Sequence, residues 1–89
     1  MSDAAKAAQV MQALTAAKGA PPPAALSMLN ELAGLVQGGD DNELEVADAR
    51  SSTFMAICEV AKALHRGQPA DGLWTAAIGA TERWIALVR

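Results

Sequence analysis

Glycine and proline cluster at three places in this chain and divide it into four segments of helical length. The clusters lie at residues 19–23, 38–39 and 67–69. The segments between them favour helix, and alanine alone occupies 21 of the 89 positions. No run alternates apolar and polar residues over the length of a strand. We therefore predict an all-α fold for residues 1–89, a single domain built as a compact antiparallel bundle of four short helices, or of five if the third one breaks.

The first two segments have recognisable ends. A first helix is expected from about Asp3 to Lys18, with Ser2 as its N-cap and Gly19 just beyond its end. A second is expected from about 23 to 37, because proline is tolerated in a first turn. Its apolar positions cover about half of the circumference, so this helix either lies centrally or contacts another chain. They are Ala25, Leu26, Met28, Leu29, Leu32, Ala33, Leu35 and Val36.

The third segment leaves two alternatives open. We expect a helix that begins near Asp41, with Asp40 as N-cap and Glu43 completing a capping box. It either continues unbroken to Arg66 or breaks at 50–53, where Arg50 interrupts the apolar stripe and three hydroxyl residues favour caps. The stripe of an unbroken helix would be Val46, Ala47, Arg50, Phe54, Ile57, Cys58, Ala61, Leu64 and His65. Five acids in 40–48 suit a helix N-terminus, and whether they also serve a function stays open.

The fourth segment is expected to be helical from Asp71, its N-cap, to about Val88. Its predicted buried stripe occupies an arc of about 80° and consists of Trp74, Ile78, Thr81, Ile85 and Val88. Trp84 falls at the margin of this arc, where an aromatic side chain can anchor an interface; alternatively both tryptophans are core. Gly34 and Gly79 lie inside helices, where each costs about 1 kcal/mol relative to alanine. They indicate close helix contacts, within the chain or with a partner.

Residues suited to catalysis or metal binding are sparse. Cys58 and His65 share a helix face but lie about 10 Å apart along it, too far for a catalytic pair or a metal cluster. Seven basic against ten acidic residues argue against nucleic-acid binding through a basic face. No apolar stretch is long enough to span a membrane, and a single cysteine fits a cytoplasmic location. We expect no enzymatic activity, no cofactor and no metal.

The sequence favours a non-enzymatic protein–protein interaction module, such as a bacterial or phage regulator, inhibitor or immunity-type protein. Its partner would be another protein or a second copy in a homodimer. The residues expected to bind the partner are Met28, Leu35, Gly79, Arg83 and Trp84. An alternative function is carriage of a small apolar ligand inside the bundle, lined by Met11, Met28, Met55 and Trp74. In a third hypothesis, the acidic segment 40–48 mimics nucleic acid on a basic partner.

Overall fold

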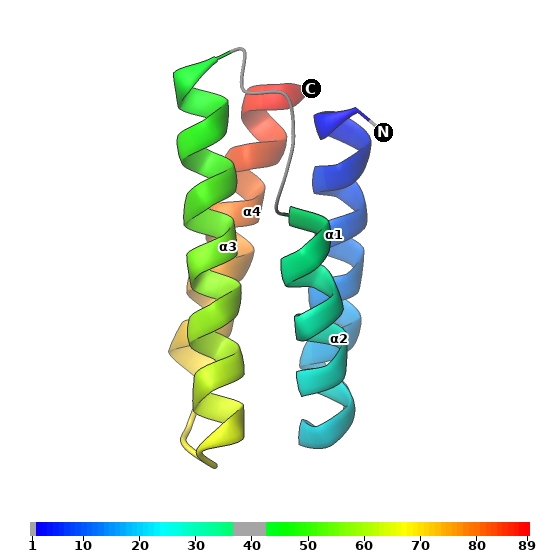
Figure 1. The fold of residues 1–89 in the computed structure, drawn as a ribbon, viewed down its shortest axis with the longest axis vertical. Coiled ribbons are helices and arrows are strands. Elements are labelled where there is room, and N and C mark those ends of the chain that lie inside the picture. Colours follow the sequence, from blue (N-terminus) through cyan, green and yellow to red (C-terminus); the bar gives the residue numbers. More distant parts are fainter. Residues whose placement is uncertain (1, 37–42) are drawn as a thin grey trace.

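The chain forms an antiparallel four-helix bundle, as predicted. The computed structural model describes residues 2–36 and 43–89, and its helices are α1 (Asp3–Lys18), α2 (Pro22–Val36), α3 (Leu44–His65) and α4 (Asp71–Val88). Successive helices run in opposite directions, and α4 returns beside α1, so the two chain ends meet at one end of the bundle (Figure 1). In these residues α1 and α3 each pack along α2 and α4, and the backbones of the diagonal pairs stay apart.

The ends of α1 and α3 show how local sequence closes these helices. The hydroxyl of Ser2 accepts a hydrogen bond from the Ala5 N–H at 3.3 Å, which confirms the predicted N-cap. Gly19 is the C-cap of α1 and keeps a right-handed φ of −87°. Gly67, with φ of 68°, takes the left-handed conformation after α3. Its N–H donates to Leu64 and that of Gln68 donates to Ala63, the two bonds of a Schellman motif.

The other boundaries differ slightly from those predicted. Helix α2 spans Pro22–Val36, one residue earlier than expected, and residues 37–42 lie outside the described part of the chain. Helix α4 begins at Asp71, but Ala70 is its N-cap and Asp71 lies in the first turn. There the carboxylate still faces the positive end of the helix dipole, so Asp71 keeps an electrostatic role without capping the helix.

Helix α3 corrects two expectations about the third segment. It begins at Leu44, not near Asp41, and Glu43 is its N-cap without a side-chain capping bond, so the predicted capping box around Glu43 is wrong. The expected cap Asp40 lies outside the described residues. The helix is continuous through 50–53, which excludes a fifth helix at this point. Thr53 fits because its hydroxyl donates to the Ala49 carbonyl, one turn earlier, at 2.9 Å.

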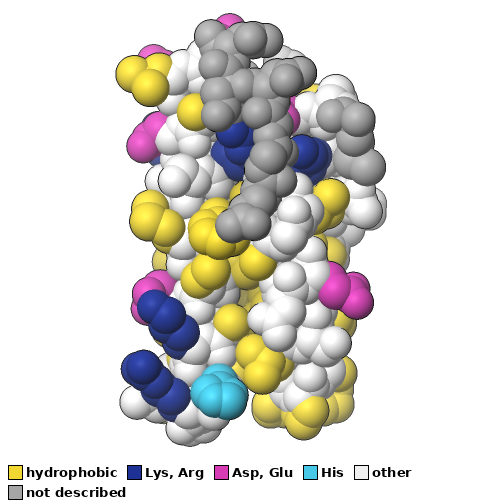
Figure 2. All heavy atoms as spheres, in the orientation of Figure 1, with side chains coloured by type: hydrophobic (Ala, Val, Ile, Leu, Met, Phe, Trp, Pro, Cys, Tyr) yellow, Lys and Arg dark blue, Asp and Glu magenta, His cyan; other side chains and the backbone are white. Residues whose placement is uncertain are grey.

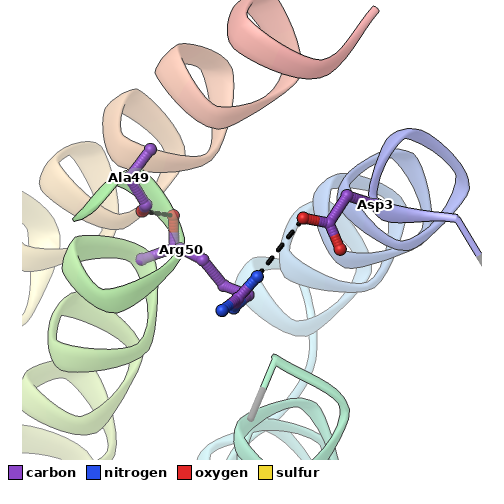
Figure 3. A network of polar contacts seen from close by, with 4 residues as sticks. Asp3, Ala49 and Arg50 are labelled. Carbon is purple, nitrogen blue, oxygen red and sulfur yellow. Dashed lines mark hydrogen bonds and ion pairs between the residues drawn. The ribbon is translucent and has the colours of Figure 1, made fainter. Parts of the chain in front are cut away.

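Arg50 is buried and joins two helices across the diagonal of the bundle. Its Nη1 lies 3.3 Å from Oδ2 of Asp3, in the first turn of α1 (Figure 3). Only 9% of the arginine side chain and 19% of the aspartate side chain are exposed. Helix α2 ends short of the N-terminal end of α3 (Figure 1), and Arg50 lies beyond that end of α2 (Figure 3). An arginine in the apolar stripe therefore does not break α3, because its charge has a partner on α1.

All four helices contribute to one core. The largest fully buried apolar side chains are Val10, Leu14, Leu29, Val36, Ile57, Val60 and Trp84. Several alanines are also buried in this core, among them Ala7, Ala17, Ala25, Ala49, Ala63 and Ala77. The buried stripe of α3 is rotated by about 80° from the predicted one: Ala49, Thr53 and Val60 are buried, whereas Cys58 is half-buried and His65 is exposed.

The core assignment of α3 predicts a contrast between two residues that are close in sequence. Ile57→Ala should lower the free energy of unfolding by about 2–5 kcal/mol, because it leaves a cavity among buried side chains. Met55→Ala, two residues away on the exposed face, should change it by about 0.5 kcal/mol or less. Urea denaturation followed by far-ultraviolet circular dichroism measures both values. Equal destabilisation by the two substitutions would contradict the assigned orientation of α3.

Candidate interaction surface

Met28 and Leu35, two of the predicted partner-binding residues, are half-buried and pack against the core. The wide apolar arc of α2 has an explanation inside the bundle. Helix α2 contacts both α1 and α3, so residues on either side of its buried stripe rest on a neighbouring helix. The arc alone therefore does not require another chain, and a role of Met28 and Leu35 in partner binding stays a prediction.

Trp84 does not lie at the margin of the α4 stripe. Its side chain is fully buried, whereas Trp74 is 6% exposed, so both tryptophans belong to the core and Trp84 offers no surface to a partner. The predicted position of Trp84 at the margin is wrong because α4 packs between α3 and α1. Contact with both helices moves the centre of the buried arc of α4 toward Ala77 and Trp84. Within the described residues, the indole Nε1 of Trp84 is a buried polar atom without a hydrogen-bond partner.

Gly79 and Arg83 lie one turn apart on the exposed face of α4. A Cβ added at Gly79 or at Gly34 would meet no atom of residues 2–36 and 43–89 within 4 Å, so neither glycine serves a close contact within this part of the chain. Of the two explanations offered for these glycines, the intrachain crossing is wrong and contact with a partner stays a prediction. Arg83 reaches α3, where its Nη2 lies 3.0 Å from Oδ2 of Asp48.

Sequence reasoning missed two apolar residues on the outer face of α3. Leu44 is 87% exposed and Met55 is 57% exposed, and they are the exposed large hydrophobic residues of the described chain. At about 100° per residue they project within about 20° of each other, opposite the buried stripe. The available signal was their place on the helical wheel, because both lie about 100° or more from the centre of even the predicted stripe.

Two shallow hollows flank this face of α3 at its opposite ends. One, of about 320 Å³, lies between α3 and α2 and is lined by Leu26, Asn30, Ala61, Lys62, His65 and Arg66. The other, of about 360 Å³, lies between α3 and α4 and is lined by Leu44, Glu45, Asp48 and Arg83. Apolar side chains gather along the seam between α3 and α2, and the histidine lies near its lower end, between basic side chains and apolar ones (Figure 2).

Charge is distributed unevenly along α3. Its N-terminal end carries Glu43, Glu45 and Asp48, and its C-terminal end carries Lys62, His65 and Arg66. All six residues are exposed. Lys62 makes an ion pair with Glu59 at 3.4 Å in which both side chains are more than half exposed. Exposed ion pairs of this kind contribute about 0–1 kcal/mol to stability, so Lys62 and Glu59 remain available to pair with other charged groups.

Groups suited to chemistry do not converge in the described part of the chain. Cys58 and His65 are seven residues apart on α3, which corresponds to about 10 Å. Residues 2–36 and 43–89 contain no group of three His, Cys, Asp or Glu side chains that could hold a metal ion. Met55, one of the four residues expected to line an interior ligand cavity, projects into solvent. No observation in these residues favours a carrier of an apolar ligand.

Comparisons with known proteins give no family for the chain. No protein-family model matches it, and no curated protein or solved structure matches it either. Among the helices that the structure describes, none combines the length and the apolar character needed to cross a bilayer.

The open space at Gly79 predicts a gain in stability. Gly79→Ala should raise the free energy of unfolding by up to about 1 kcal/mol, because alanine is the better helix former and its methyl group has room. Gly34→Ala, also exposed inside a helix, is the matched control and should behave alike. Thermal unfolding followed by circular dichroism measures the change, and destabilisation by either substitution would show a crowded site.

Proposed function

We propose that this protein is a non-enzymatic helical interaction module that binds another protein or a second copy of itself. The contact surface is the outer face of α3 with the adjoining end of α4. The observation that carries the proposal is the exposure of Leu44 and Met55 on one side of α3. Burying one large apolar side chain is worth about 1.5–3 kcal/mol, so a partner that covers both gains appreciable binding free energy.

The surroundings of Leu44 support a specific contact. Its isobutyl group stands beside a hollow whose other lining residues are Glu45, Asp48 and Arg83, so an apolar projection is framed by charges of both signs. Apolar centres with polar rims are typical of protein–protein interfaces. Arg83 was predicted from the sequence to bind the partner. Gly79, one turn before it, has no side chain, so the surface of α4 does not project beside Arg83.

A substitution at Leu44 tests the proposal. Leu44→Glu should abolish partner binding, because it puts a charge where an apolar group must be desolvated. It should not unfold the protein, since the side chain is exposed and a glutamate in a first turn suits the helix dipole. The measurement is affinity capture from a lysate of the source cells, together with sedimentation velocity of the purified protein.

Gln12→Glu is the matched control, because it adds one negative charge at an exposed position on α1, away from α3. The native protein and this control should retain the same partner, and Leu44→Glu should lose it. A protein that captures nothing and remains monomeric at high concentration would refute the proposed function. Capture that is unaffected by Leu44→Glu would place the interface elsewhere on the bundle.

A further inference from the structure

We infer that the partner of the α3 face is a second copy of this chain, packed against it antiparallel about a twofold axis at Met55. This inference rests on the proposed function and names its partner. Within the described chain the backbone of α3 packs along α2 and α4, and Arg50 reaches α1 through the interior of the bundle, so the outer face of α3 is not covered by these residues. That length is about 33 Å for 22 residues.

The spacing of the residues on this face fits a helix–helix seam. Starting from Leu44, steps of alternately four and three residues lead along the outer side of α3, the 3.5-residue period of helices that pack side by side. The positions reached are Leu44, Asp48, Ser51, Met55, Cys58, Lys62 and His65. All are exposed except Cys58, which is half-buried. Met55 is the central position of this series and places a large apolar side chain midway along the helix.

The charges decide the direction of the second copy. In an antiparallel pair centred on Met55, residues equally far before and after it face each other. Asp48, seven residues before, then meets the partner's Lys62, seven residues after. Leu44, eleven before, meets the partner's Arg66, eleven after, beside the hollow that Leu26 and Ala61 line. A parallel pair would instead align the acidic ends with each other, and like charges repel.

In the twofold arrangement, each contact made by one copy is repeated by the other copy. Each Leu44 enters the hollow between α3 and α2 of the other copy, where Leu26 and Ala61 offer apolar contacts beside basic side chains, and each acidic end meets a basic end. Such a contact is closed, because the same surface serves both copies, so it gives dimers and no filaments. A standard interface buries roughly 800 Å² per partner around an apolar core, whereas this face carries two exposed large apolar side chains, Leu44 and Met55. The dimer is therefore expected to be weak and reversible, with a dissociation constant in the micromolar range or above.

Cysteine cross-linking tests the register. A disulfide requires Cα atoms within about 7 Å, and only the residue on the twofold axis comes that close to its own copy. Met55→Cys in a Cys58→Ser background should therefore oxidise readily to a covalent dimer. Leu44→Cys in the same background is the control: its thiol would be the more exposed one, so random collisions would cross-link it at least as fast. Faster cross-linking at residue 55 supports the inference, and cross-linking at 44 that equals or exceeds it overturns it.

A charge reversal tests the predicted ion pairs in the native cysteine background. Asp48→Lys should weaken dimerisation by roughly tenfold or more in sedimentation equilibrium, because it faces the partner's Lys62. Adding Lys62→Asp should restore the dimer. These residues are fourteen positions apart in one helix, about 21 Å, so a rescue must act between chains. Circular dichroism confirms that each variant is folded, and absence of rescue overturns the inference.

The outcomes also separate this inference from the proposed function. A native protein that remains monomeric at high concentration, but captures another protein that Leu44→Glu releases, overturns the homodimer and leaves the interaction module standing. A monomer that captures nothing refutes both. A dimer that cross-links through residue 55, that Asp48→Lys weakens and that Lys62→Asp restores supports both.

Discussion

The unequal lengths of α2 and α3 set the constraint on which the rest of this bundle depends. Helix α2 has 15 residues and α3 has 22, a difference of about 10 Å of helix. Over the length they share, aliphatic side chains, alanines and Trp74 fill the interior. Beyond the end of α2 lies the ion pair of Arg50 with Asp3. Arg83 of α4 pairs with Asp48, which lies two residues before Arg50 on α3. Trp84 follows Arg83 in sequence and therefore also lies near this end of the bundle.

This arrangement explains why polar groups are tolerated in a small core. Removing one partner of a buried ion pair is costly, because the remaining charge stays desolvated, so Arg50 holds the start of α1 in register with α3. The unpaired indole N–H of Trp84 costs about 1–3 kcal/mol, and burial of its large ring offsets that cost. Trp84 thus serves volume, not hydrogen bonding, in a chain with few other aromatic side chains.

The features that could be predicted from the sequence are those with local causes. Ser2 caps α1 through its own hydroxyl, and the glycine–proline clusters divide the helices wherever they fall in the described chain. The rotation of each helix could not be predicted, because the neighbours on both sides determine it. Phe54 and Cys58 moved the centre of the predicted α3 stripe toward themselves, yet both are half-buried at the edge of the observed one. Small residues such as Ala49 and Ala63 are buried on the other side of the observed stripe.

The rotation of α4 determined which of its candidate surface residues are exposed. Arg83 is exposed wherever α4 is centred, whereas Trp84 passes from the margin of the stripe into the core when α4 turns by less than a quarter of a circle. Acids at the start of α3 and bases at its end need no partner to explain them, since both stabilise the helix dipole. A helix with this polarity nevertheless has an outer face that is complementary to itself when reversed. Self-complementarity therefore follows from ordinary helix electrostatics once Leu44 and Met55 supply apolar contacts on that face.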